Sequence, residues 1–247
     1  METNIQLEIL PQPDDTTCGP TCLHAVYQYY GDAISLQEVI NQVRILMGGG
    51  TLEVLLGCHA LRRGYCASIY TYNLQVFDPT WFEPSSIDLV EKLDLQIKEK
   101  TSKKLAIATD AYKEFIQLGG CLRFQDLTTG LIRKYLKQQK PILCGLSSTY
   151  LYHCAREFGP NQDYDDIRGI PTGHFVVLCG YDPNTRQVLV ADPLKQNPLS
   201  EGHYYEVDIN RLIGSILLGI ITYDGNLLII SPKKKNLKDH DDPNHCG

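Results

Sequence analysis

The sequence predicts an α+β fold, with an N-terminal, mainly helical half followed by an antiparallel β-sheet half. Apolar residues recur with helical spacing in several segments before residue 140, and short strand-like runs separated by turns follow residue 173. The 247 residues, 43% of them hydrophobic, suffice for one substantial core. We see no internal repeat and no linker, so residues 1–230 are predicted to form a single domain. The tail 231–247 is Lys-rich, then Asp- and His-rich, and is predicted to be disordered.

Capping residues and glycines predict where the helices of the first half begin and end. The first helix should end at Gly31, and Ser35 with Glu38 forms a capping box that starts the second. Thr51 should cap the third helix, which Gly64 closes. The helices are expected at 18–30, 35–45, 51–63, 86–99, 103–118 and 128–139, and strands at 66–72, 121–125 and 141–146.

The second half contains turns and short apolar runs. Residues 150–172 are rich in Gly, Pro, Asp and Tyr and are predicted to form a long loop, a kind of segment that is often functional. Pro183–Arg186 is a turn that should join two strands as a hairpin. The strands are expected at 174–181, 187–191, 203–207, 217–223 and 226–230, with a short helix at 208–214.

Composition excludes several classes of function. A net charge of −6 argues against nucleic acid as a partner, and no apolar stretch is long enough to cross a membrane. The N-terminus lacks the basic and apolar regions of a secretory signal. Nine cysteines, an odd number, do not suggest a disulfide framework, so we predict a cytoplasmic protein. Cys58-His59 and His153-Cys154 match no standard zinc module, so no metal or cofactor is predicted.

The segment most informative about function is Gln12-Pro-Asp-Asp-Thr-Thr-Cys18-Gly-Pro-Thr-Cys22. It places Cys18 at the start of a helix, where the helix dipole favours a thiolate, the nucleophilic form of cysteine. Gln12, six residues upstream, could donate to an oxyanion. Cys22 lies one turn further on and is expected in the core, although a redox pair with Cys18, or metal binding with His24, stays open.

A cysteine nucleophile needs a base and a group that orients the base. His174 is the best-placed base because it opens the apolar strand Gly173-His-Phe-Val-Val. Asp192 ends the partner strand of the hairpin, in Val190-Ala-Asp-Pro. Antiparallel pairing around the turn should therefore bring Asp192 close to His174.

These motifs, in the order Gln, Cys, His, Asp, resemble the C39-like cysteine peptidases, which have a papain-like fold. The resemblance covers roughly residues 5–230. It implies that Cys18 is the nucleophile, His174 the general base and acid, and Asp192 the orienting residue. It also implies that Gln12 and the backbone N–H of Cys18 form an oxyanion hole.

The resemblance leaves the substrate open. The C39 peptidases joined to bacteriocin exporters cut leader peptides after a double glycine, but this chain has no transmembrane segment or Walker motif. It is more similar to the free-standing C39-like proteins, and we expect a peptide or amide-containing small molecule, cleaved through a thioester. Because the fold is similar to phytochelatin synthase, an acyltransferase, transpeptidase or amide-exchange activity is one alternative. A catalytically silent peptide-binding module is the other, and the oligomeric state is not predicted.

Residues 150–172 directly precede His174 and are a candidate lid or substrate wall. This segment carries the candidate substrate-binding residues Tyr150, Arg156, Asn161 and Arg168.

Overall fold

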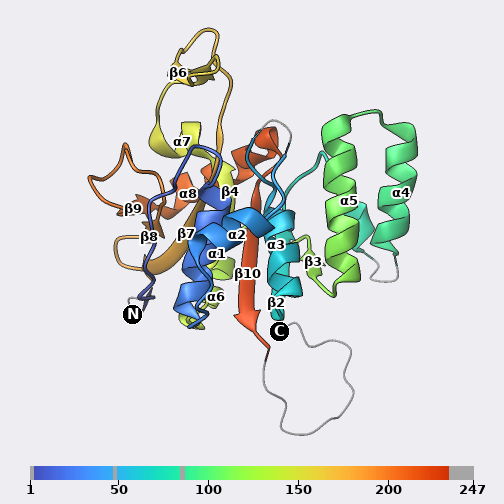
Figure 1. The fold of residues 1–247 in the computed structure, drawn as a ribbon, viewed down its shortest axis with the longest axis horizontal. Coiled ribbons are helices and arrows are strands. Elements are labelled where there is room, and N and C mark those ends of the chain that lie inside the picture. The colour runs from blue at the N-terminus through green and yellow to red at the C-terminus, as the bar shows by residue number, and fades with distance from the viewer. Residues whose placement is uncertain (1–2, 47–48, 84–86, 234–247) are drawn as a thin grey trace, which may run out of the picture.

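The computed structural model describes residues 3–46, 49–83 and 87–233. Helices are interspersed along the chain with the strands of a large sheet (Figure 1), which confirms the predicted α+β class. The helices are α1 (Cys18–Tyr29), α2 (Leu36–Gln42), α3 (Glu53–Arg62), α4 (Leu89–Glu99), α5 (Lys103–Gln117), α6 (Thr129–Lys137), α7 (Ser148–Tyr152) and α8 (Ile209–Leu218), with short 3-10 turns η1 (Pro79–Phe82) and η2 (Gly219–Thr222).

The described strands form an eight-stranded sheet and a separate two-stranded hairpin. The large sheet has the order β3-β2-β10-β4-β7-β8-β9, and β1 also pairs with β7. All its pairings are antiparallel except β2 with β3. The strands are β1 (Thr3–Asn4), β2 (Tyr65–Thr71), β3 (Cys121–Arg123), β4 (Ile142–Ser147), β5 (Glu157–Phe158), β6 (Asp163–Tyr164), β7 (Gly173–Asp182), β8 (Gln187–Ala191), β9 (Tyr204–Asp208) and β10 (Asn226–Pro232).

The three strands predicted in the mainly helical first half of the chain are present as β2, β3 and β4, and they join the same sheet as the C-terminal strands. Strand β3 pairs with β2, β2 lies beside the C-terminal β10, and β4 lies between β10 and β7. Strand β10 runs to Pro232, two residues past residue 230. Of the predicted disordered tail, residues 234–247 lie outside the described part of the chain.

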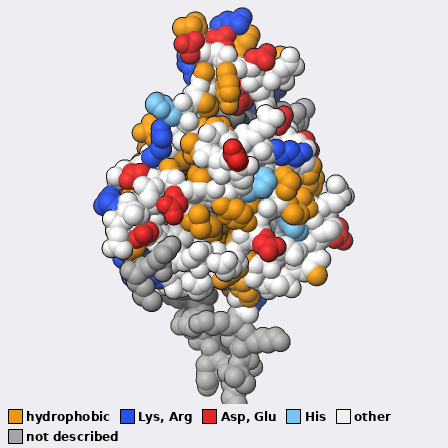
Figure 2. Space-filling model, turned by 90° about the vertical axis from the view of Figure 1, so that its left-hand side faces the viewer, with side chains coloured by type: hydrophobic (Ala, Val, Ile, Leu, Met, Phe, Trp, Pro, Cys, Tyr) orange, Lys and Arg blue, Asp and Glu red, His pale blue; other side chains and the backbone are white. Residues whose placement is uncertain are grey.

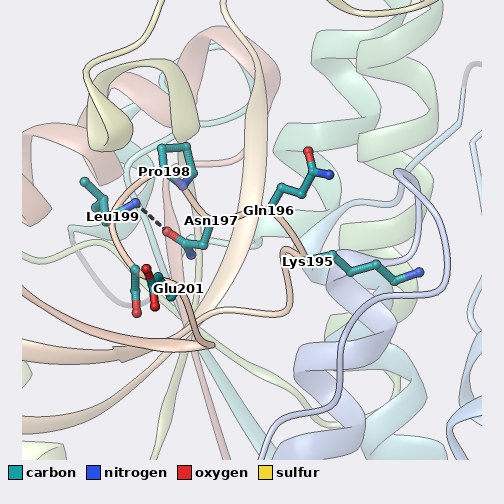
Figure 3. A pocket seen from close by; sticks show the side chains of 7 residues that line it. Lys195, Gln196, Asn197, Pro198, Leu199 and Glu201 are labelled. Atoms are coloured by element: carbon teal, nitrogen blue, oxygen red, sulfur yellow. Dashed lines mark hydrogen bonds between the residues drawn. The ribbon is translucent and has the colours of Figure 1, made fainter.

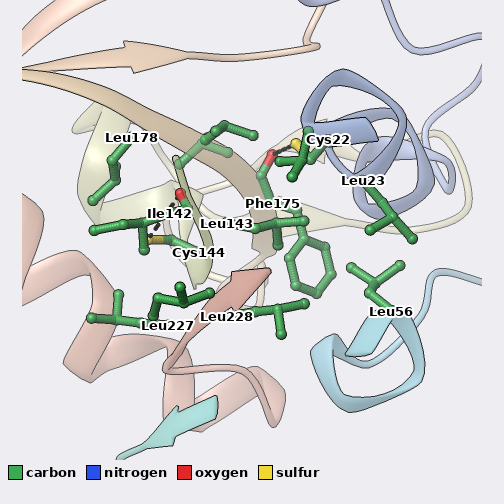
Figure 4. Packing of buried hydrophobic residues seen from close by; sticks show 14 of the residues in the cluster. Cys22, Leu23, Leu56, Ile142, Leu143, Cys144, Phe175, Leu178, Leu227 and Leu228 are labelled. Atoms are coloured by element: carbon green, nitrogen blue, oxygen red, sulfur yellow. Dashed lines mark hydrogen bonds between the residues drawn. The ribbon is translucent and has the colours of Figure 1, made fainter. Parts of the chain in front are cut away.

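The core packs helices α1 and α3 against the sheet. Helix α1 contacts β7, and α3 contacts β2 and β10. Phe175 of β7 links the two helices, since its ring points toward the side where Leu23 of α1 and Leu56 of α3 lie (Figure 4). All three side chains are buried, so the strand carrying His174 is fixed against the helix carrying Cys18.

Two segments differ from the sequence-based expectation. Residues 150–172 were expected to be a loop, but they begin with the end of α7 and continue into the β5–β6 hairpin, which projects at the top of Figure 1. Strands of two residues are too short to produce a periodic pattern. Residues 217–223 were expected to be a strand, but α8 and η2 occupy them. Leu217, Leu218 and Ile221 remain exposed there, so the apolar run does not mark a buried strand.

Helix α8 packs on β4, and the α4–α5 pair stands at the right of Figure 1 against α3. In the described part of the chain, no helix is both long and apolar enough to cross a lipid bilayer.

Candidate active site

Helix α1 begins at Cys18. The side chain of the preceding Thr17 does not cap the helix, because its hydroxyl donates to the Asp14 carbonyl instead. The N–H groups of the first turn therefore have no partner from a capping side chain. Pro20 is well suited to this turn because it has no N–H to satisfy. The start of α1 thus offers backbone donors beside a thiol that is 8% exposed.

Close contacts hold α1 against β7. A Cβ on Gly19 would lie 2.8 Å from Thr51 Cγ2 and 3.1 Å from Phe175 Cδ2, so only glycine fits here. One turn later, Cys22 Sγ donates to the Phe175 carbonyl at 3.2 Å (Figure 4). Cys22 is fully buried, and burial raises the pKa of its thiol well above the ordinary value. Cys22 is therefore part of the packing that places Cys18 next to the strand of His174.

His174 and Asp192 meet across two paired strands. The β7–β8 pairing sets Val177 opposite Ala191, as expected from the predicted hairpin. His174 Nε2 lies 2.9 Å from Asp192 Oδ1. An ionised carboxylate only accepts hydrogen bonds, so Nε2 is the donor and Nδ1 is the nitrogen left for the thiol. Cys18 is within side-chain hydrogen-bonding reach of the same ring.

The charges of the three groups favour an ion pair. Burial of the imidazole opposes its protonation, but the negative charges of Asp192 and Cys18 outweigh it and raise the pKa of His174 to about 10. Burial of Asp192 also opposes its ionisation, and the His174 charge and its hydrogen bond lower the pKa of Asp192 to about 2. Both shifts favour an imidazolium beside an aspartate carboxylate, an arrangement that stabilises a neighbouring thiolate.

Two tyrosines that sequence reasoning missed complete the surroundings of Asp192. The hydroxyls of Tyr152 and Tyr205 donate to Asp192 Oδ2 at 2.7 and 2.8 Å. Tyr205 has the burial of an ordinary strand residue, and Tyr152 lies in the segment expected to be a loop. Nothing in the local sequence distinguishes either residue from a core tyrosine.

Gln12 is buried and fastened to the loop that follows Asp192. Its backbone N–H donates to the Pro193 carbonyl at 2.8 Å, and its Nε2 donates to the Asp14 carbonyl at 3.0 Å. Lys195 Nζ strengthens this attachment by donating to the Pro13 carbonyl at 3.2 Å. An amide nitrogen carries two hydrogens, so Gln12 retains one for another acceptor. Its Oε1 is buried without a hydrogen-bond partner.

Of the four residues predicted to bind substrate, Tyr150 lies on α7, and Arg156, Asn161 and Arg168 lie in or next to the β5–β6 hairpin in the sequence. Tyr150 has its ring against Gly214 and is 47% exposed, and Asn161 is exposed near the hairpin tip. Arg156 donates to the carbonyls of Asp166 and Ile167, so it is engaged within its own segment.

Arg168 is engaged within the hairpin too. Its Nε donates to Asp165 Oδ2 at 2.6 Å, and its guanidinium lies 4.3 Å from the centre of the Phe158 ring. Acidic, basic and hydrophobic side chains all occur on the part of the surface that projects at the top of Figure 2. Substrate binding by these residues remains a prediction, and their visible contacts hold the hairpin together.

A hollow of about 700 Å³ is lined by seven consecutive residues, Lys195–Glu201 (Figure 3). Asn197 shapes this loop by accepting a hydrogen bond from the Leu199 N–H at 2.9 Å. None of its lining residues belongs to the group Cys18, His174 and Asp192. Among the described side chains, no group of three or more His, Cys, Asp or Glu residues is arranged to hold a metal ion.

Residues 4–214 match the model of the Peptidase_C39 like family. A search of the curated proteins gives no significant match. Solved structures with similar folds share 13 or 14% identity with this chain. The double glycine motif protease from an AMS/PCAT transporter, solved with its leader peptide, has 14% identity and a TM-score of 0.44, covering 93% of this chain and 94% of its own.

Two further structures are similar at the same level. The peptidase domain of Streptococcus ComA, a bifunctional ABC transporter involved in a quorum-sensing pathway, has 13% identity and a TM-score of 0.44, covering 92% of this chain and 98% of its own. A C39-like peptidase from Bacillus anthracis has 13% identity and a TM-score of 0.45, covering 94% and 98%.

Proposed function

Because the chain belongs to the Peptidase_C39 like family, we propose that it is a cysteine peptidase that hydrolyses an amide bond through a thioester on Cys18. The observation that carries the proposal is the position of His174, whose Nε2 is bonded to Asp192 and whose ring lies within hydrogen-bonding reach of Cys18. Family membership alone supports the class of enzyme. The geometry around this histidine supports the presence of the machinery in this chain.

In the first half of the reaction, the Cys18 thiolate attacks the carbonyl carbon of the substrate. The carbonyl oxygen takes up the negative charge, and the free backbone N–H at the start of α1 and the remaining Gln12 Nε2 hydrogen stabilise it. The His174 imidazolium then gives its proton to the departing amine as the C–N bond breaks. A thioester and a neutral imidazole result.

In the second half, water attacks the thioester. His174 removes a proton from the water, the C–S bond breaks, and the acid product leaves with Cys18 again as a thiolate beside an imidazolium. Asp192 keeps its charge throughout and holds the ring in the tautomer that both steps require. The substrate is proposed to be a peptide.

The first test needs no substrate. Iodoacetamide should alkylate Cys18 faster than any other thiol of the native chain at neutral pH, and His174→Ala should slow this reaction strongly. Cys22→Ala is the matched control, because it removes a thiol from the same helix while leaving Cys18 in place. Alkylation of Cys18 no faster than that of buried thiols would contradict the proposal and favour a silent binding module.

The second test asks for turnover. The wild-type chain should generate new termini in a complex peptide mixture followed by mass spectrometry, and Cys18→Ala should generate none. Added hydroxylamine should capture part of the acyl group as a hydroxamate, which detects the thioester. The products formed without hydroxylamine distinguish hydrolysis from acyl transfer, since water as the acceptor gives the free acid and a peptide amine as the acceptor gives a new amide. Cleavage retained by Cys18→Ala would rule out the assigned nucleophile.

A further inference from the structure

The Asp192 carboxylate is fully buried and receives a complete set of hydrogen bonds. Oδ1 accepts from His174 Nε2 and from the Leu194 N–H, both at 2.9 Å. Oδ2 accepts from the Tyr152 hydroxyl at 2.7 Å and from the Tyr205 hydroxyl at 2.8 Å. A carboxylate has about four lone-pair sites, so these four donors leave no unused acceptor position.

The two tyrosines come from elements that carry neither Asp192 nor His174. Tyr152 is the last residue of α7, and Tyr205 lies in β9. Both side chains are buried, with 8% and 6% exposed, and both hydroxyls converge on the same oxygen. Each ring is held by its surroundings, so its hydroxyl has a fixed position relative to Oδ2.

The arrangement fixes both the orientation and the charge of Asp192. Rotation of the carboxyl group would break two hydrogen bonds at Oδ2 and one to His174 at once. Protonation of Oδ2 would place a third hydrogen where two hydroxyl hydrogens already point, which is unfavourable in a buried site.

We propose that Tyr152 and Tyr205 are positioning residues that clamp Oδ2 of Asp192, so that Oδ1 stays ionised and aimed at His174 Nε2. This inference rests on the proposed function for the role of His174, and it assigns the tyrosines no contact with substrate. They act on the reaction only through the aspartate.

The clamp connects the candidate triad to two segments that border it. Tyr152 lies directly before the stretch that leads into the β5–β6 hairpin. Tyr205 lies next to the side chain of Asn197. Asn197 belongs to the loop Lys195–Glu201 shown in Figure 3. The carboxylate is therefore fastened to structure on both sides of the β7–β8 pair and does not depend on that pair alone.

The experiment uses Tyr152→Phe, Tyr205→Phe and the double variant of the full chain. Phenylalanine keeps the ring and removes only the hydroxyl. The matched control is Tyr70→Phe, which removes a buried hydroxyl bonded to the Tyr135 hydroxyl at 2.7 Å, away from Asp192. The readout is the rate at which iodoacetamide alkylates Cys18 as a function of pH.

Each single variant should slow alkylation at neutral pH by roughly tenfold, since a hydrogen bond to a charged group is lost, and the double variant should lose more. The acid midpoint should move to higher pH, because Asp192 then takes up a proton more readily. Tyr70→Phe should match the wild type. A merely structural role would reduce the amount of folded protein without moving the midpoint, and unchanged midpoints in folded variants would overturn the proposal.

A second measurement keeps this test separate from that of the proposed function. In wild-type protein, the proton on His174 Nε2 should give a far-downfield NMR resonance, and the Asp192 carboxyl carbon should titrate well below the ordinary aspartate range. Both signals are independent of turnover and of Cys18 reactivity. If Cys18 is inert but these signals change in the Phe variants, the proposed function fails and the clamp stands. An Asp192 that titrates in the ordinary range would overturn the clamp even in an active enzyme.

Discussion

His174 Nε2, on strand β7, and Asp192 Oδ1, directly after the neighbouring strand β8, lie 2.9 Å apart. The negative charge of Asp192 is the largest of the influences that raise the pKa of His174, to about 10, against the opposing effect of burial. In the folded protein His174 is therefore expected to keep its proton at pH values well above the ordinary pKa of histidine. This relationship gives the first prediction.

Asp192→Asn should lower the rate of Cys18 alkylation and of any turnover by at least about tenfold. Removing the charge lowers the pKa of His174, so the imidazolium loses its proton at lower pH. The alkaline limb of the alkylation profile should therefore move to lower pH, while circular dichroism verifies that the variant is folded. An alkaline limb at the same pH as in the wild type would show that Asp192 does not set the charge of His174.

Gln12→Ala tests the oxyanion role. Removing one oxyanion donor costs about 10²- to 10³-fold in kcat and leaves KM nearly unchanged, because the interaction strengthens only as charge develops on the substrate oxygen. The rate of Cys18 alkylation should stay close to that of the wild type, since iodoacetamide alkylation develops no oxyanion. Equal losses in alkylation and turnover would instead indicate that Gln12 holds the loop around Pro193 in place.

The candidate catalytic residues could be predicted from the sequence, but the tyrosines that hold Asp192 in place could not. Cys18 at a helix start and the His174–Asp192 hairpin follow from local signals, namely helical periodicity, a turn and strand pairing. Tyr152 and Tyr205 could not be found this way, because their partner lies 40 and 13 positions away and depends on the packing of α7 and β9. The two-residue strands β5 and β6 carry no periodicity, and the exposed apolar run after Ile216 imitates a strand.

Gly19→Ala tests the close approach of α1 to β7. The added methyl group would contact Thr51 and Phe175 at distances that force one of them to move, which costs about 1–3 kcal/mol of stability. The shift should also slow Cys18 alkylation, because Cys18 is the neighbouring residue. Gly130→Ala in α6 is the control: its Cβ would meet nothing nearer than 3.5 Å, so the melting temperature should be unchanged or higher. Equal effects of the two substitutions would contradict the packing argument.

Shortening the β5–β6 hairpin tests its predicted role as a substrate wall. Replacing residues 159–162 with a two-residue Asn-Gly turn removes Asn161 and keeps the strands Glu157–Phe158 and Asp163–Tyr164. If the hairpin binds substrate, KM for a cleaved peptide should rise several-fold. Cys18 alkylation should be unaffected, because the triad is untouched. Unchanged KM would exclude the hairpin tip from substrate binding.

The last prediction concerns Glu53 and Asp224, two carboxyls that are buried, with 1% and 5% exposed, and close enough for the charge of Asp224 to act on Glu53. Burial raises the pKa of both carboxyls, that of Asp224 to about 7, and the charge of Asp224 raises the pKa of Glu53 further. A carboxyl whose folded pKa lies above its unfolded value binds more protons in the folded state, so stability falls as pH rises. For Asp224 the loss should occur between about pH 4 and pH 7. Asp224→Asn should therefore raise the melting temperature more at mildly alkaline pH than at acidic pH, whereas Glu206→Gln, on the exposed face of β9, should change little at either. A destabilisation by Asp224→Asn that is equal at both pH values would mean that the carboxyl acts through its contact with Thr222 and that its ionisation carries no cost in the folded protein.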